Sequence, residues 1–179
     1  LFVTNTEARN EVRFEGPGTG GATTVRGQLH EARISVIDGA GNVLPRPLNP
    51  HIAALPQGYR TVPMPPAVKD ASLATPLGMA LGGDGTLYVA AFGSSKVGRI
   101  AAAALEDGSF APDAASHIEL GGGGPTGLVL GPGDARLYVL TRFDNAVRVV
   151  DPASGTELAV HPLHNLEPAQ VRADVHVGR

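Results

Sequence analysis

The sequence contains no cysteine among its 179 residues. This absence excludes disulfides, Cys-ligated zinc and covalently attached c-type haem from the chain, although it does not identify the compartment. Tryptophan is also absent, and three tyrosines and five phenylalanines are the only aromatic residues. No apolar run reaches the length of about 18 residues that a membrane helix needs, so we expect no membrane span. The net charge of −3 predicts no attraction to nucleic acid.

Glycine and proline are abundant, with 24 and 15 residues respectively, and 42% of the chain is hydrophobic. So many residues that interrupt helices favour short elements joined by tight turns. The hydrophobic content is high enough for a packed core. Together these numbers predict an all-β fold.

An internal repeat is the main evidence for the architecture. The segment PLGMALGGDGTLYVAAFGSSKVGRI, from Pro76, aligns with PTGLVLGPGDARLYVLTRFDNAVRVV, from Pro125, and Leu87-Tyr88-Val89 matches Leu137-Tyr138-Val139. The offset changes by one residue inside the turn between the first two expected strands, where an insertion costs least. Each copy predicts four antiparallel strands, which is one blade of a β-propeller.

A third, incomplete copy opens the chain. Residues 1–3 resemble the Leu-Tyr-Val strand, and residues 33–38 resemble residues 147–151. We therefore predict a partial β-propeller over residues 1–179, with about three blades of four-stranded antiparallel sheets. Because closed propellers have about 4 to 8 blades, this chain alone does not close the ring, and we expect the remaining blades in a longer parent chain. The expected divisions are an incomplete blade at 1–49 with an insertion at about 6–32, a connector at 50–74, blades at 75–120 and 125–163, and the start of another blade at 164–179.

Several stretches resemble one family more closely. NTEARNEVRFEGPG, LHEARISVIDG, LYVAAFGSSKVG and LYVLTRFDNAVRVVD are similar to bacterial YVTN-repeat β-propeller proteins, in particular the extracytoplasmic group associated with c-type cytochrome modules. The resemblance implies a periplasmic or cell-surface location and a protein or redox module that docks on the propeller face. Haem c is implied only for the parent protein, because this chain has no Cys-x-x-Cys-His motif.

The insertion carries charges at every second position. If it is extended, these charges share one face, and they form either a docking surface or a solvated face of weak ion pairs. His30 and Glu31 close the insertion, but one His beside one Glu is too small a set for a metal site. The candidate interaction residues are Glu7, Arg9, Glu11, Arg13, Glu15, His30 and Glu31.

The remaining motifs predict structural roles. Residues 121–124 are all glycine, but they precede an apolar strand and not a helix, so we interpret them as a linker and not as a phosphate cradle. Asp84, Asp134 and Asp144 are expected to bond to their own turns. Tyr88 and Tyr138 occupy equivalent positions, which predicts packing between adjacent blades.

Two classes of function remain open. The first is a non-catalytic binding or scaffold propeller, with the insertion as its interaction surface. The second is part of a metal-dependent hydrolase or lyase propeller of the lactonase type, which needs carboxylates or amides on the innermost strands. Residues 78–81 and 127–130, the expected innermost strands, contain none. We therefore assign no catalytic, cofactor or metal residue to this chain, and favour the first class.

Overall fold

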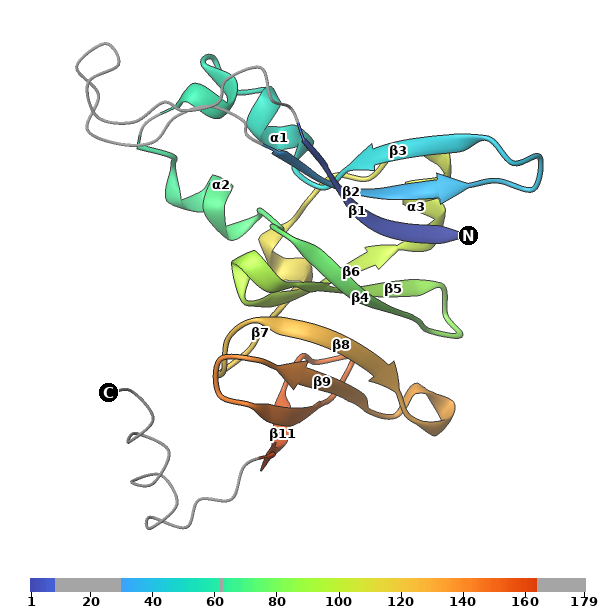
Figure 1. The fold of residues 1–179 in the computed structure, drawn as a ribbon, viewed down its shortest axis with the longest axis vertical. Helices are drawn as coiled ribbons and strands as arrows, with labels where there is room; N and C mark the ends of the chain where they lie inside the picture. Colours follow the sequence, from blue (N-terminus) through green and yellow to red (C-terminus); the bar gives the residue numbers. More distant parts are fainter. Residues whose placement is uncertain (9–29, 62, 164–179) are drawn as a thin grey trace, which may run out of the picture.

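A computed structural model describes residues 1–8, 30–61 and 63–163. Three antiparallel sheets stack face to face along the longest axis (Figure 1), with strand orders β1-β2-β3, β4-β5-β6-β7 and β8-β9-β10-β11. The predicted all-β propeller fragment with an open ring is confirmed. The strands are β1 (Phe2–Ala8), β2 (His30–Ile37), β3 (Val43–Pro47), β4 (Pro76–Leu81), β5 (Thr86–Ala91), β6 (Lys96–Ala101), β7 (His117–Glu119), β8 (Pro125–Leu130), β9 (Leu137–Thr141), β10 (Ala146–Val150) and β11 (Glu157–Pro162).

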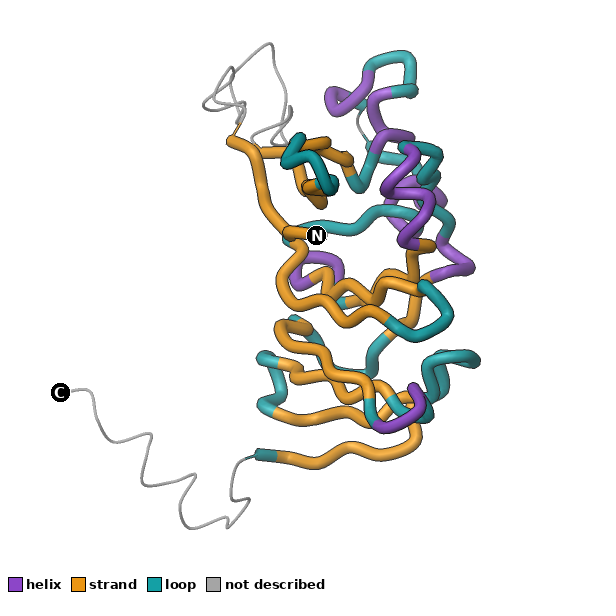
Figure 2. The backbone as a smooth tube through the Cα atoms, turned by 90° about the vertical axis from the view of Figure 1, so that its right-hand side faces the viewer, coloured by secondary structure: helices purple, strands orange, loops and turns teal. Residues whose placement is uncertain are grey.

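Short helical segments lie between the strands. Most of them fall in the connector, residues 50–74, or in turns, and Figure 2 shows the connector helices running beside the strands. Residues 50–74 lack a hydrophobic period in the sequence, so these turns were not predicted. The segments are α1 (Pro50–Ala53), α2 (Pro66–Asp70) and α3 (Ala102–Asp107), with 3-10 turns η1 (Gly58–Arg60), η2 (Phe92–Ser94), η3 (Ala114–Ser116) and η4 (Pro132–Asp134). No helix in the described residues is long and apolar enough to span a membrane.

The strand registers support the alignment of the third copy. Leu1 and Ile37 exchange two backbone hydrogen bonds of 2.9 and 2.8 Å. They therefore form a hydrogen-bonded pair of an antiparallel ladder. The same position is occupied by equivalent residues in the two complete sheets. The equivalent pairs are Leu1–Ile37, Leu87–Ile100 and Leu137–Val150.

Two hydrophobic clusters hold the stack together. One lies between the first two sheets, where Ile34 and Val36 of β2 pack with Leu87 and Val89 of β5. The other lies between the second and third sheets, and it includes Tyr88 of β5 with residues of β9 and β10. Because side chains alternate along a strand, each sheet uses one face for the preceding sheet and the other for the following sheet.

The inner strands β4 and β8 lie against each other. A Cβ atom on Gly78 would be 2.6 Å from the carbonyl oxygen of Thr126 and 3.0 Å from Cα of Gly127. Only a residue without a side chain permits this approach. The expected innermost strands therefore lie side by side, as adjacent blades around a common axis require.

The first sheet differs from the other two. Its ladder runs from Phe2–Val36 to Ala8–His30, so strand pairing extends into both ends of the expected insertion. The sheet has three strands, and no described strand occupies the inner position next to β1. Thr4 of β1 instead donates its hydroxyl to the carbonyl oxygen of Leu77 in β4, at 2.7 Å.

Antiparallel order puts the loops at two opposite ends of the strands. We call one end the connector face; it contains residues 48–75, 92–95, 120–124 and 142–145. We call the other the hairpin face; it contains residues 82–85, 131–136 and 151–156. In Figure 1 the connector helix α2 marks the first end, and the tight β4–β5 and β8–β9 turns mark the second.

Candidate functional site

The paired ends of β1 and β2, from Thr6 to Ala8 and from His30 to Arg33, form a charged hairpin that lies at the connector face. Glu7 and Arg33 form an ion pair with an Oε2–Nη1 distance of 2.7 Å, and their side chains are 39% and 19% exposed. Glu31 lies opposite Glu7 in the ladder, whereas His30 lies opposite Ala8 and therefore points to the other side of the sheet. The predicted residues Arg9, Glu11, Arg13 and Glu15 lie outside the described residues, so their part in a docking surface stays a prediction.

A pair of phenylalanines also lies at the connector face. Phe92 from the β5–β6 turn and Phe143 from the β9–β10 turn pack edge to face, with ring centroids 5.3 Å apart. Phe143 is nevertheless 68% exposed. The glycine run passes directly beside them, since a Cβ on Gly123 would be 2.2 Å from Cδ2 of Phe143. These glycines are a linker as predicted, and their lack of side chains makes room for the rings.

A buried arginine, Arg148, lies directly beside the same glycine run. The side chain of Arg148 is 8% exposed and pairs with both Asp144 and Glu157. Thr141 donates its hydroxyl to Asp144 at 2.6 Å. This hydrogen bond, together with the one from Arg148, lowers the pKa of Asp144 below its usual value despite partial desolvation. A Cβ on Gly122 would be 2.4 Å from Asp144, so the ion pairs need glycine there.

The three aspartates predicted as turn residues all lie in the connections between strands, but their carboxylates differ in what they bond to. Asp84 accepts from the backbone N–H of Thr86 in its own turn, at 2.8 Å. Asp134 instead accepts from the N–H of Gly83, in the preceding blade, at 2.6 Å. Asp144 bonds to side chains of its own blade. The predicted bond within its own turn is therefore wrong for Asp134, because a turn motif does not say which distant donor the carboxylate meets.

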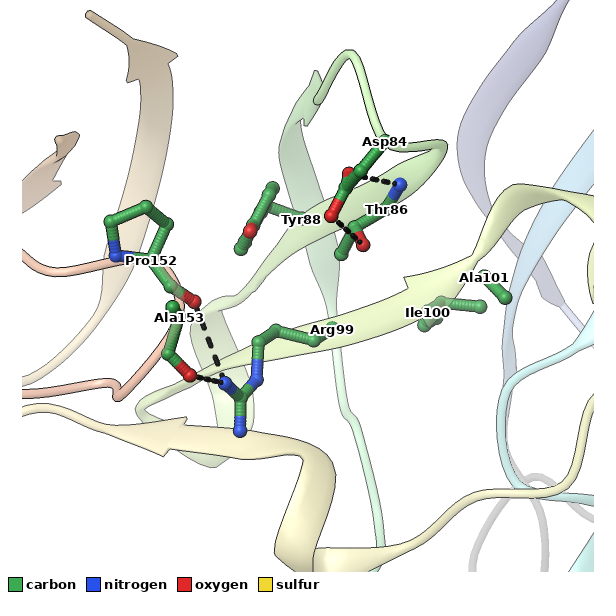
Figure 3. Close-up of a pocket in the computed structure, with 8 residues that line it drawn as sticks. All are labelled: Asp84, Thr86, Tyr88, Arg99, Ile100, Ala101, Pro152 and Ala153. Carbon is green, nitrogen blue, oxygen red and sulfur yellow. Dashed lines mark hydrogen bonds between the residues drawn. The ribbon is translucent and has the colours of Figure 1, made fainter. Parts of the chain in front are cut away.

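An open groove of about 350 Å³ lies at the hairpin face, between the second and third sheets (Figure 3). One wall comes from sheet 2 and the other from the β10–β11 turn. Burial raises the pKa of Tyr88, and the negative charge of Asp84 raises it further. The phenol therefore stays protonated at neutral pH and remains a hydrogen-bond donor. The residues that line the groove include Asp84, Thr86, Tyr88, Arg99, Pro152 and Ala153.

Arg99 joins the two walls of this groove. Its guanidinium donates to carbonyl oxygens of Ser116 and Ala115 in η3, just before β7, at 2.9 and 3.3 Å. It also donates to those of Ala153 and Pro152 in the next blade, at 2.6 and 3.4 Å. Figure 3 shows the contacts that cross between the sheets. These bonds use the planar, branched geometry of arginine. The groove therefore contains an inter-blade clamp, and within its β4–β5 turn the hydroxyl of Thr86 donates to the carboxylate of Asp84 at 3.0 Å.

We expect Arg99→Lys to lower the free energy of unfolding by about 1–2 kcal/mol, because one ammonium group cannot reach carbonyls on both walls. Urea denaturation followed by circular dichroism measures the change. Arg136→Lys is the matched control, since Arg136 is exposed and its side chain bonds only to the neighbouring carbonyl of Ala135. Equal losses in the two variants would contradict the clamp.

A buried histidine fastens the connector to sheet 2. His117 lies 3.1 Å, through Nδ1, from the carbonyl oxygen of Asp70 in α2, and the ammonium of Lys96 donates to the same oxygen at 2.7 Å. Burial lowers the pKa of His117, and the positive charge of Lys96 lowers it further, against smaller opposite effects from the hydrogen bond to the Asp70 carbonyl and from the charges of Glu119 and Asp113. The imidazole is therefore held neutral where it contacts the connector.

This histidine makes stability depend on pH. The unfolded chain binds a proton at His117 near pH 6.5, whereas the folded chain binds it only at lower pH, so the free energy of unfolding rises with pH across that window. The contribution is present above about pH 6.5 and is lost as pH falls through the folded pKa. We expect His117→Gln to reduce the difference in Tm between pH 8 and pH 5. His161→Gln, at an exposed position, is the control, and an unchanged difference in His117→Gln would refute the assignment.

The inner strands offer no ligands to a metal. β4 has the sequence PLGMAL and β8 has PTGLVL, so the hydroxyl of Thr126 is their sole polar side-chain group. Over the described ranges, no three His, Asp or Glu side chains converge in a way that could hold a metal ion. A channel site of the lactonase type therefore has no support from the two complete sheets.

Sequence reasoning predicted some of these features and missed several side-chain contacts. It located the charged hairpin, the glycine linker and the tyrosine positions. It did not locate the phenylalanine pair, the Arg99 clamp or the Arg148 ion pairs. The only signal for these was a departure from the repeat: Arg99 and Arg148 occupy positions at which the other copy has Val149 and Gly98.

Comparisons with known proteins agree with the fold. Solved structures that resemble this chain include hydrazine synthase from Kuenenia stuttgartiensis, with 18% identity, a TM-score of 0.56, and coverage of 86% of this chain and 42% of that one. A putative 6-phosphogluconolactonase from Bacteroides fragilis has 11% identity, a TM-score of 0.51, and coverage of 92% and 54%. No protein-family profile and no curated sequence matches the chain.

These neighbours are β-propeller proteins, and the present chain has the same fold. It spans about half or less of their length. At such low identity the similarity shows the fold and not the activity.

Proposed function

We propose that this chain is a non-catalytic binding and scaffold segment of a β-propeller protein, and that its connector face docks a protein partner. The observation that carries the proposal is the exposed Phe143, which is held by Phe92 although most of its ring faces solvent. A rigid aromatic side chain at the surface is the typical anchor of a protein interface. Its position on a loop of a fixed scaffold is where binding residues concentrate.

The charged hairpin adds a second feature to the same face. Glu7 and Arg33 are paired at its base, and the stretch of sequence between them carries the alternating charges. Charges at an interface direct association and select partners more than they add affinity. The aromatic pair would then supply affinity, and the hairpin would supply selectivity.

We further propose a periplasmic or cell-surface location and a c-type cytochrome module as the partner. This part rests on the resemblance to YVTN-repeat propellers. Any haem c belongs to the parent protein or to the partner, because this chain has no cysteine to attach it. The connector face is then a support for electron-transfer chemistry that takes place outside these residues.

The test uses a soluble c-type cytochrome as the probe, with Kd measured by calorimetry at low salt. We expect Phe143→Ser to raise Kd about tenfold, which corresponds to about 1.4 kcal/mol. Leu158→Ser is the matched control, because Leu158 is also exposed but lies near the hairpin face. No binding, or an equal effect of the two substitutions, would overturn the proposal.

A second measurement addresses the alternative of a metal-dependent hydrolase or lyase. The same protein is assayed for lactone hydrolysis with calcium and with a chelator. We expect no turnover in either condition. Turnover that the chelator abolishes would replace the scaffold proposal with the enzymatic one.

A further inference from the structure

The groove at the hairpin face contains a tyrosine whose hydroxyl has no protein partner. Tyr88 is 6% exposed, because it lies in one cluster with Leu137 and Val139 of β9, so its predicted packing between blades is confirmed. No described sheet follows the third one, so the same expectation for Tyr138 stays a prediction. Tyr88 also lines the groove, and within the described ranges no group forms a hydrogen bond with its hydroxyl. A hydroxyl on a largely buried ring normally has such a partner, and a molecule bound in the groove would supply it.

A carboxylate without a cation lines the same groove. Asp84 accepts from the backbone N–H and from the hydroxyl of Thr86, at 2.8 and 3.0 Å, with one bond to each of its two oxygens. These bonds hold the carboxylate in its turn and lower the pKa of Asp84, so it is ionised at neutral pH. Each oxygen keeps a second acceptor position. In the part of the chain that the structure describes, Asp84 forms no ion pair with a lysine, arginine or histidine.

The charges around the phenol favour a cation in the groove. Asp84, Asp134 and Asp151 act on the phenol as negative charges, whereas Arg99 acts on it as a positive charge. Arg136 offsets part of this excess through its effect on Asp151, but the carboxylates still outnumber the guanidinium groups. Arg99 is also occupied by its four carbonyl contacts, and Figure 3 shows its guanidinium directed at the β10–β11 turn and away from Asp84. A positively charged ligand group near Asp84 therefore meets a negative potential.

We propose that this groove binds a small amino alcohol. The ammonium group of the ligand donates to the free acceptor positions of Asp84, and its hydroxyl oxygen accepts from Tyr88. The aliphatic side chains of Ile100 and Pro152 line the groove beside these groups and contact the carbon skeleton. A volume of about 350 Å³ is at the lower end for ligand pockets, which suits a small molecule. The proposal is independent of the proposed docking function, because the groove and the connector face lie at opposite ends of the strands.

Ligands of similar size test the chemical class. The probe is vicinal aminocyclohexanol; cyclohexylamine lacks its hydroxyl, and vicinal cyclohexanediol lacks its ammonium group. Titrations at neutral pH and low salt are followed by amide NMR shifts, which we expect to change at Thr86 and Ala153 of the groove. We expect the Kd to be about fivefold higher for cyclohexylamine and at least about tenfold higher for cyclohexanediol, because a hydrogen bond to a charged group contributes more than a neutral one.

Conservative substitutions test the two residues. Asp84→Asn removes the charge but keeps an acceptor for the turn, and we expect it to raise the Kd of aminocyclohexanol at least about tenfold. Asp38→Asn is the matched control, since the carboxylate of Asp38 also accepts from its own turn, at 2.8 and 2.9 Å, but lies outside the groove. Tyr88→Phe keeps the packing of the ring, and we expect it to raise the Kd about fivefold. Tyr138→Phe is its control, at the equivalent position of the next sheet.

Each measurement also has a result that would overturn the proposal. The absence of saturable shifts with aminocyclohexanol would mean that water alone fills the groove. Equal affinities for aminocyclohexanol and cyclohexanediol would show that no cation is recognised. A Tyr88→Phe variant with unaltered affinity, or equal losses in a groove variant and its control, would remove these residues from the site. The comparison of the three ligands uses the unaltered chain, so it decides the ligand class even where a variant fails to fold.

Discussion

Replacing Gly78 by alanine is expected to lower the free energy of unfolding by about 3 kcal/mol. The added Cβ would lie 2.6 Å from the carbonyl oxygen of Thr126 and 3.2 Å from the backbone nitrogen of Leu128. These are backbone atoms of β8, so they move only if sheets 2 and 3 separate. Overpacking of this kind costs about 1–3 kcal/mol, and a backbone clash lies at the upper end. Urea denaturation followed by circular dichroism measures the loss.

Gly127 is a matched control for this experiment, because it is the repeat equivalent of Gly78 and lies on the facing strand. A Cβ on Gly127 meets only the Cβ of Leu140, at an ordinary contact distance of 3.9 Å. We expect Gly127→Ala to change stability by no more than about 1 kcal/mol, since alanine also restricts the unfolded chain. Similar losses in both variants would show that glycine is needed for strand conformation and not for the approach of the blades.

Replacing Arg148 by methionine is expected to cost about 2–3 kcal/mol at neutral pH. The substitution leaves Asp144 and Glu157 close together without their shared cation. Removing one partner of a buried pair costs about 3–5 kcal/mol, and the loss is smaller here because about a third of each carboxylate side chain is exposed. Thermal unfolding of the variant beside Arg142→Met measures the effect; Arg142 is an exposed arginine of the same turn.

The pH dependence provides an independent check on Arg148. The pKa of Asp144 is below its usual value in the folded protein, so this group stabilises the fold above about pH 4 and loses that contribution as pH falls through the folded pKa. Without Arg148 the pKa rises, and the contribution decreases. We therefore expect the difference in stability between the variant and the unaltered protein to shrink below pH 4. A difference that is independent of pH would mean that Arg148 acts by packing alone.

Much of the fold could be predicted because the repeat is local information. Leu87-Tyr88-Val89 and Leu137-Tyr138-Val139 indicate equivalent strands, and the Asp84-Gly85 turn is a hairpin signal that the structure confirms, with Gly85 at a φ of 83°. The innermost strands were also recognised as apolar runs without ligands. Each of these inferences needs only residues that are close in the chain.

The candidate site was predicted less completely. Glu7, His30 and Glu31 were named from the sequence, and the described ends of the hairpin lie at the connector face. Their part in an interaction surface stays a prediction. Phe92 and Phe143 were not recognised as a pair, because they occupy different positions of the repeat. α3 was also missed: it follows β6 where the other copies have an aspartate turn, at Asp38 and Asp151.

Local composition and periodicity thus specify the strands, their order within each sheet and the repeat, because hydrogen-bonded neighbours lie a few residues apart along the chain. The contacts between sheets depend on how the stacked blades meet in space. Arg99 reaches Ala153 across a separation of 54 residues, and Gly78 touches a backbone about 50 residues away. The sequence around each residue does not identify these partners, because they follow from blade packing. The clamp and the close approach therefore became visible only in three dimensions.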